Sequence, residues 1–364
     1  ISPDNDLFET ISDLISFKTV YQNNPEEFDK CIKYIKEYFK NTNLYIEECE
    51  FNNSKSLVIS NQKTKNFDII FCGHIDVVPA EEKLFTIKRN NDILYGRGVS
   101  DMKGQVAVMM QIMKDLAQKP TEKKVALFIT SDEERGGFDG TNKLLNEQNF
   151  SCKVAIVPDG GFNFSLVIEE KGVLQIKITA EGKNSHASEP WKGENAITKL
   201  FELYSYINSK FPQPKDQHNW KTSFNIGKIE GGDSINKVPN KASIYIDIRH
   251  VHNDKIENII NFIKDFDESL NIEILAIGKS FKTNKNNEYI KKYIDVCESL
   301  LNRKIEIIKL HCASDGRFFT EKNIPCIMMN PEGGNIHCDD EWVNLNSLYK
   351  LKDIYKCYIE KITK

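Results

Sequence analysis

Residues 67–79, FDIIFCGHIDVVP, begin as a largely apolar run and end in a polar segment that carries His74 and Asp76. Three other short apolar runs match this one: SLVIS (56–60), VALFIT (125–130) and VAIVP (154–158). Helical spacing of apolar residues appears between them, over 103–119 and 140–148. Strands too apolar to have one wet face, alternating with helices, predict a mostly parallel sheet with helices on both faces.

The pattern changes at residue 172, where GVLQIKITAEG (172–182) alternates apolar and polar residues as a half-exposed strand does. From there to residue 278 the order is strand, helix, strand, strand, helix, strand, which is that of a split βαβ unit. After residue 282 the first pattern returns, with helices expected over 287–301, 315–322 and 346–362 and strands over 304–309 and 324–330. We therefore predict an α/β domain in two parts, 1–171 and 282–364, with an α+β domain inserted at 172–281.

Composition excludes several classes of protein. The 364 residues include 49 Lys and Arg against 53 Asp and Glu, a net charge of −4, which argues against a nucleic-acid partner. No apolar run approaches the roughly 18 residues that span a bilayer, so we expect no membrane insertion. The first residues show no signal peptide, and the nine cysteines form no CxxC pair, so we expect a cytoplasmic protein with reduced thiols.

Ionisable residues follow the predicted strands at the points where those strands end. They are His74 and Asp76, Asp132 to Glu134, Asp159 and His337, and Asp101 stands at the start of the 103–119 helix. Each has an ordinary explanation, since Asp101 suits a helix N-cap and an Asp-Glu-Glu run suits a solvated loop. The glycines of GRGVSDMKG (96–104) could also form a phosphate loop, but no long apolar strand precedes them.

Taken together, these groups indicate a metal centre, because ligands bind at the carboxyl ends of parallel strands. Two imidazoles and four carboxylates (Asp101, Glu133, Glu134 and Asp159) exceed what one tetrahedral ion needs. If one carboxylate bridges, two zinc ions, or cobalt or manganese, can share the set and leave one carboxylate as a base. Asp76, two residues after His74, is placed to accept the second imidazole N–H.

Several of these segments resemble metallopeptidase family 20, which includes aminoacylase, carboxypeptidase G, dipeptidases and succinyl-diaminopimelate desuccinylase. The matching motifs are GHIDVVP (73–79), GRGVSDMKG (96–104), TSDEERGG (130–137) and HCDDE (337–341). Within the insert, NSHAS (184–188), SINKVPN (234–240) and DIRH (247–250) are similar to the family's lid-domain motifs. The resemblance implies a catalytic domain in two parts and an inserted lid that also dimerises.

The resemblance also implies a role for each residue of the catalytic domain. His74 and Asp159 would hold one metal, Glu134 and His337 the other, and Asp101 would bridge the two. Glu133 would be the general base and acid, and Asp76 would orient His74.

In the lid, His186 of a second subunit would stabilise the oxyanion, which implies a homodimer. Asn236 and Arg249 would hold the terminal carboxylate of a small substrate, and Gly316 would line the pocket. The alternatives are a surface role for His186 and a sheet-face ion pair for Arg249. His218, His250, His252 and His311 belong to no motif and receive no role.

The resemblance leaves the substrate open between an N-acyl amino acid and a short peptide. SDGRFF (314–319) and TSF (222–224) favour a desuccinylase. Asp159, where that branch usually has Glu, and His311-Cys312-Ala313, where it has Gly-Gly-Thr, favour a peptidase. A dipeptidase, a carboxypeptidase and an aminoacylase all remain alternatives. A binding protein that senses amino acids or peptides without catalysis is the alternative outside the enzymes.

Overall fold

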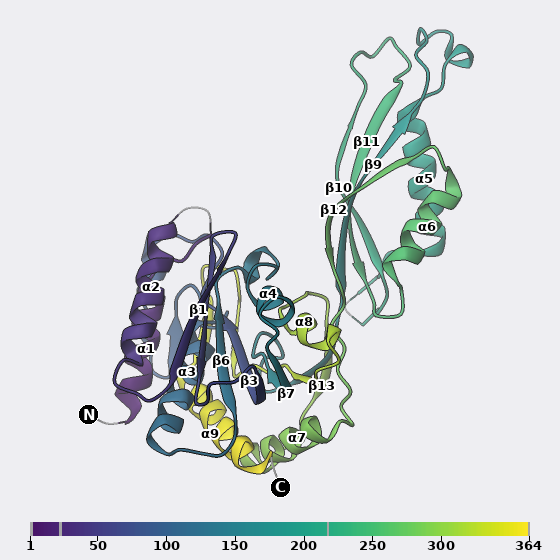
Figure 1. The fold of residues 1–364 in the computed structure, drawn as a ribbon. Coiled ribbons are helices and arrows are strands. Elements are labelled where there is room, and N and C mark those ends of the chain that lie inside the picture. The colour runs from purple at the N-terminus through teal and green to yellow at the C-terminus, as the bar shows by residue number, and fades with distance from the viewer. Residues whose placement is uncertain (1–2, 22–23, 217, 363–364) are drawn as a thin grey trace. The chain divides into compact units, whose positions relative to one another are not determined.

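The computed structural model describes residues 3–21, 24–216 and 218–362 (Figure 1). The chain divides into two compact units. The larger unit comprises the described residues up to Ile168, together with Lys282–Leu310 and those from Ser314 onward. The inserted unit comprises Glu169–Phe281 and, in addition, His311–Ala313, a short segment that the sequence did not associate with the insert.

A six-stranded sheet forms the centre of the larger unit. Its order is β1 (Tyr45–Phe51), β2 (Ser54–Ser60), β6 (Val125–Thr130), β3 (Asn66–His74), β7 (Ser151–Ile156) and β14 (Cys326–Ile327). The pairs β6–β3, β3–β7 and β7–β14 are parallel, whereas β1 and β2 add to one side as antiparallel strands. This is the mainly parallel α/β sheet that the apolar runs predict.

Helices cover both faces of this sheet, because successive side chains of a buried strand point to opposite sides. On one face, α3 lies on β3 and β6 and packs against α1 and α9, and Phe71 contacts Tyr355 with ring centroids 4.9 Å apart. On the other face, α4 and α8 pack together, and Cys72 Sγ lies 3.4 Å from Thr141 Oγ1. The helices of this unit are α1 (Pro3–Ser16), α2 (Pro25–Tyr38), α3 (Lys103–Gln118), α4 (Thr141–Asn146), α7 (Glu288–Leu301), α8 (Gly316–Glu321) and α9 (Leu345–Lys361).

Two smaller sheets complete the larger unit. One pairs β8 (Leu166–Glu170) with β13 (Ile307–Leu310), and the other has the order β15 (Gly333–Gly334), β16 (Trp342–Asn344), β5 (Ile93–Tyr95) and β4 (Lys88–Asn90). The strand expected over 304–309 therefore lies outside the main sheet, and only Cys326 and Ile327 of the run 324–330 pair as a strand. None of the described helices is both long and apolar enough to cross a bilayer.

The inserted unit is a four-stranded antiparallel sheet with two helices. Its order is β10 (Ser223–Gly231), β11 (Lys241–His250), β9 (Gly172–Glu181) and β12 (Asn271–Gly278). The helices α5 (Ala196–Lys210) and α6 (Ile256–Phe266) bury one face of this sheet, on which Leu174, Ile176 and Ile178 are fully buried. Burying each such side chain contributes about 1.5–3 kcal/mol, so the unit has a core of its own.

Candidate metal centre

The ionisable residues singled out in the sequence meet at the carboxyl edge of the parallel strands. His74 is the last residue of β3, Glu133 and Glu134 begin a short 3-10 turn (Glu133–Arg135) after β6, and Asp159 follows β7. Asp101 lies just before α3, and His337 lies between β15 and β16. Adjacent parallel strands end on the same side of a sheet, so residues far apart in sequence become neighbours there.

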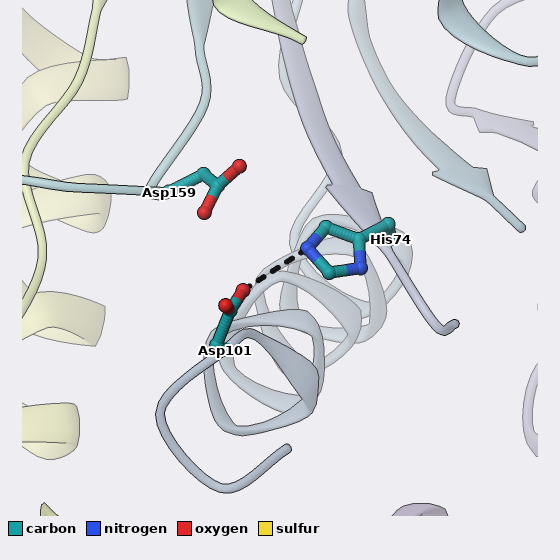
Figure 2. Close-up of side chains that lie close together, drawn as sticks. All are labelled: His74, Asp101 and Asp159. Atoms are coloured by element: carbon teal, nitrogen blue, oxygen red, sulfur yellow. Dashed lines mark hydrogen bonds and ion pairs between the residues drawn. The ribbon is translucent and has the colours of Figure 1, made fainter. Parts of the chain in front are cut away.

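One group of potential ligands consists of His74, Asp101 and Asp159, whose ligand atoms lie within 4.8 Å of one another (Figure 2). His74 Nε2 is 3.2 Å from Asp101 Oδ1, and in Figure 2 the Asp159 carboxylate lies beside this pair. His74 and Asp101 are buried, with 1% and 9% exposed. A nitrogen and two carboxylates in this arrangement match the ligands that zinc, cobalt and manganese accept.

A second group consists of Asp101, Glu134 and His337, again with ligand atoms within 4.8 Å of one another. His337 Nε2 lies 3.1 Å from Asp101 Oδ2 and 3.3 Å from Glu134 Oε1. Asp101 therefore presents one carboxylate oxygen to His74 and the other to His337. A carboxylate placed in this way could bridge two metal ions.

The charges in this cluster shift each other's pKa values. Burial opposes a charge on His74, yet contacts with Asp101 and Asp76 hold the pKa of its imidazole well above the ordinary value. Hydrogen bonds to Asp101 and Glu134 raise the pKa of His337 to about 10. Burial likewise opposes ionisation of Asp101, but His337 and His74 keep its pKa below the usual range. The carboxylates thus favour a positive charge on the two imidazoles, and a divalent cation would supply that charge in exchange for the imidazole protons.

Glu133 lies beside the first group. Its Oε2 is 4.0 Å from His74 Nε2, and its side chain is 12% exposed. Burial and the neighbouring charge of Asp159 raise the pKa of the Glu133 carboxyl well above its ordinary value. A carboxyl with a raised pKa, next to potential metal ligands, is suited to accept and return a proton.

Asp76 supports the cluster in a different way from the one expected. The closest acceptor to His74 Nδ1 is the backbone oxygen of Asp76, at 2.9 Å, whereas the carboxylate Oδ1 is 3.4 Å away. The other carboxylate oxygen, Oδ2, accepts a hydrogen bond from the Glu134 N–H at 2.9 Å. Asp76 is fully buried, and through these contacts it helps to position both His74 and the backbone of Glu134.

Two residues that the sequence did not single out join the loop of Asp101 to the loop of His337. The carboxylate of Glu341 accepts hydrogen bonds from the backbone N–H groups of Gly98, Ser100 and Asp101 at 2.9–3.1 Å. Arg97 Nη1 donates to Glu341 Oε2 at 2.8 Å and to the Cys338 oxygen at 3.0 Å. Both side chains are buried, with 2% of Arg97 and 1% of Glu341 exposed. The available sequence signal was their position, since each lies four residues from a candidate ligand, Asp101 or His337.

Two residues next to this ion pair, Gly98 and His337, have a backbone conformation with positive φ. Gly98 has φ +85, a conformation that favours glycine, and a Cβ there would lie 2.9 Å from a methyl group of Val77. His337 has φ +66, which is unusual for a residue with a side chain. Arg97 Nη2 donates to the His337 oxygen at 3.2 Å, so the guanidinium helps to hold the ligand loop in this conformation.

Gly316 is the first residue of α8 and is buried. Its neighbour Arg317 donates to the oxygen of Gly136 at 2.6 Å, which ties this helix to the turn that carries Glu133 and Glu134. Gly316 therefore belongs to a segment that supports the ligand turn.

The remaining predicted residues belong to the inserted unit. His186 is exposed, and its Nδ1 lies 2.7 Å from Ser188 Oγ. The exposed Asn236 is close to it, since the Ala187 N–H donates to the backbone oxygen of Asn236 at 3.0 Å. Arg249 on β11 forms a two-point ion pair with Asp247, at 2.7 Å and 3.2 Å. The unit thus brings His186 and Asn236 together in adjacent loops, and Arg249 faces a carboxylate of its own strand.

Comparison with known proteins agrees with the fold and with the class of site. The model of peptidase family M20/M25/M40 matches residues 70–361. A succinyl-diaminopimelate desuccinylase of Nautilia profundicola is 28% identical, with 98% of each chain aligned. The structure of aminopeptidase PepT from Bacillus cereus has a TM-score of 0.82 at 19% identity and covers 99% of both chains. A dinuclear metal-binding peptidase of the M20 family from Bacillus subtilis has a TM-score of 0.72 at 13% identity, covering 98% of this chain and 97% of its own.

Proposed function

The chain belongs to peptidase family M20/M25/M40 and is a metal-dependent hydrolase, and from this premise we propose that it uses two metal ions to cleave an amide bond. The proposed substrate is an N-acyl amino acid or a small peptide with a free carboxylate, with N-succinyl-diaminopimelate as the first candidate. The observation that carries the proposal is the position of Asp101, whose two oxygens face His74 and His337 at 3.2 Å and 3.1 Å.

The residues present fit a pair of divalent cations. His74 and Asp159 are the proposed ligands of one ion, Glu134 and His337 those of the other, and Asp101 is the proposed bridge. Imidazole and carboxylate donors suit zinc, with cobalt and manganese as alternatives. When bound, the ions would polarise the substrate carbonyl and make water a stronger nucleophile at neutral pH.

Glu133 is the proposed general base. It takes a proton from the attacking water and then gives that proton to the nitrogen of the leaving amine. Its raised pKa, caused by burial and by Asp159, suits a group that must both accept and return a proton. Asp76 keeps the neighbouring groups in position through its contacts with His74 and with the Glu134 N–H.

In the inserted unit, we assign His186 of a second subunit to the oxyanion of the intermediate. Asn236 and Arg249 are assigned to the terminal carboxylate of the substrate, because a guanidinium can bind both carboxylate oxygens at once. In the structure the Arg249 guanidinium forms an ion pair with Asp247, so a substrate carboxylate would have to share or replace this partner. Gly316 is proposed to line the substrate pocket.

A homodimer through the inserted unit is part of the proposal. Strand β12 lies at an edge of its sheet and exposes Ile274, Leu275 and Ile277 by 47%, 47% and 45%. An exposed apolar edge strand is suited to pair with a second copy across a two-fold axis. We also propose a cytoplasmic location, consistent with the absence of any disulfide among the nine cysteines, all of which lie in the described ranges.

The test compares substrates on one purified, metal-loaded sample. Amine release would be measured with N-succinyl-diaminopimelate, a panel of dipeptides and a panel of N-acetyl amino acids, before and after removal of metal by a chelator. We expect chelator-sensitive release from the succinylated substrate. Release from dipeptides alone would replace the desuccinylase assignment with a peptidase, and chelator-resistant release would contradict the metal mechanism.

A further inference from the structure

Lys171 is an unusual residue of the inserted unit, because its side chain is buried without a compensating charge. It stands immediately before β9 and is 1% exposed. Over residues 3–21, 24–216 and 218–362, no hydrogen bond or ion pair to the Lys171 ammonium is formed. Burying an ammonium without a partner is costly, and such groups are found preferentially at functional sites.

The strand register places Lys171 beside Arg249. Val173 of β9 pairs with Arg249 of β11, and Lys171 precedes Val173 by two residues, so both cationic side chains lie on the same side of the sheet. This side is opposite to the one that carries Leu174 and Ile176 into the helix-covered core. Burial and, to a smaller extent, the positive charge of Arg249 lower the pKa of the Lys171 ammonium.

The nearby carboxylates are engaged with other groups. Asp247 binds Arg249 and also accepts from Gln175 Nε2 at 2.8 Å. Glu169 Oε2 accepts from Trp220 Nε1 at 3.0 Å, and Glu170 Oε1 accepts from Cys312 Sγ at 3.7 Å.

Trp220 forms the aromatic neighbour of this cation. The Lys171 ammonium lies 5.7 Å from the centroid of the Trp220 ring, and His311 lies on the same ring at 5.3 Å. A tryptophan face attracts a cation only weakly compared with a carboxylate, so it orients the lysine and leaves its N–H donors available.

We infer that Lys171, next to Arg249, binds a second carboxylate of the substrate. The preferred substrate would then carry two acidic groups, a terminal carboxylate held by Arg249 and another held by Lys171. Diagonal positions on neighbouring strands lie about 7–8 Å apart, a separation that two carboxylates of one acylated amino acid can span. This inference rests on the proposed function and extends it to an acidic acyl group such as succinyl.

The experiment uses two substrates that differ only in this charge. N-succinyl and N-butyryl derivatives of the same amino acid have the same chain length, and the second has a methyl group in place of the distal carboxylate. In metal-loaded protein, we expect Lys171→Met to raise KM for the succinyl substrate by about 10- to 100-fold and to leave kcat nearly unchanged. The constants for the butyryl substrate should not change, and Lys171→Arg should restore most of the affinity.

Lys177→Met is the matched control, because Lys177 lies on the same strand and on the same side of the sheet but its ammonium lies near the Tyr245 ring. It should leave both substrates unaffected. Equal losses on both substrates in Lys171→Met, or no loss on either, would overturn the inference.

A binding measurement separates this inference from the proposed function. Succinate should raise the thermal unfolding midpoint of the wild-type protein more than butyrate does, and this difference should disappear in Lys171→Met. Absence of turnover on every substrate together with this succinate effect would refute the proposed function alone. Turnover without any succinate preference in binding or in KM would refute the role of Lys171 alone.

Discussion

Replacing Glu341 by glutamine tests whether the buried ion pair with Arg97 holds the metal centre in place. The Glu341 carboxylate receives the N–H groups of Gly98, Ser100 and Asp101 as well as the guanidinium of Arg97. Glutamine has nearly the same shape but replaces one accepting oxygen with an NH₂ group. That NH₂ group would face donors that it cannot satisfy, and Arg97 would keep a buried charge without its partner.

The expected magnitude follows from the burial of the pair, with only 2% of Arg97 and 1% of Glu341 exposed. Breaking a buried ion pair by removing one partner costs about 3–5 kcal/mol. At about 2–4 °C per kcal/mol for a unit of this size, the melting temperature of the metal-free protein should fall by about 6–20 °C. Because Asp101 and His337 lie on the two joined loops, metal affinity should also fall by about 10- to 100-fold, as for other residues that orient ligands.

The assay is a zinc titration in competition with a chromophoric chelator, combined with thermal unfolding of the metal-free protein. Asp339→Asn is the control, since Asp339 is an exposed carboxylate of the same loop and its loss changes the charge equally. Glu341→Gln should weaken zinc binding and lower the melting temperature, whereas Asp339→Asn should do neither. A Glu341→Gln protein that binds zinc within about threefold of the wild type would refute the proposed clamp.

Three further predictions concern the centre itself. Glu133→Gln should keep both metal equivalents by elemental analysis but lose about 10²–10⁴-fold in turnover, and full turnover by this variant would remove Glu133 as the base. The affinity of the metal-free protein for zinc should rise between pH 6 and pH 9. Hydrogen bonds raise the pKa of His337 to about 10, and the imidazolium must release its proton before it can bind an ion. A zinc affinity that does not change with pH in chelator competition would contradict this prediction. Asp76→Ala should weaken zinc binding by about 10- to 100-fold, since the Glu134 N–H loses its acceptor, and unchanged affinity would show that Asp76 is dispensable.

The pattern of apolar residues was sufficient to predict the central strands of the main sheet, because these strands are buried along most of their length. Strands β3 and β6 are apolar along most of their length and are covered on both faces, so a short apolar run is a clear signal. Strand β1, with the sequence YIEECEF, was not predicted. It is an antiparallel strand at the edge of the sheet, and because it is largely exposed and rich in glutamate it lacks the apolar run that marks a buried strand. A strand was predicted over 304–309, but its pairing with β8 was not, because pairing partners depend on tertiary contacts that the sequence of one segment does not specify.

The candidate ligands could be identified for a similar reason, since each stands next to a recognisable strand or helix. Arg97 and Glu341 could not, because their connection is 244 residues long in sequence and becomes visible only when two loops meet. Asp76 was expected to orient His74 with its carboxylate, but the backbone oxygen lies closer to the ring and the carboxylate instead holds the Glu134 N–H. The charge of Asp76 suggested that its carboxylate would contact His74, but the turn after β3 brings the backbone oxygen closer to the ring.

The most direct test of a dinuclear centre is a count of metal ions in the wild-type protein and in Asp101→Asn. Elemental analysis and a titration with cobalt would be made on both, with Asp339→Asn as the charge-matched control. We expect two tightly bound equivalents in the wild type and in the control, and at most one in Asp101→Asn, because Asp101 presents one carboxylate oxygen to each of the two histidines. A single equivalent in the wild type, or two equally tight equivalents without the Asp101 carboxylate, would contradict a dinuclear centre bridged by this residue.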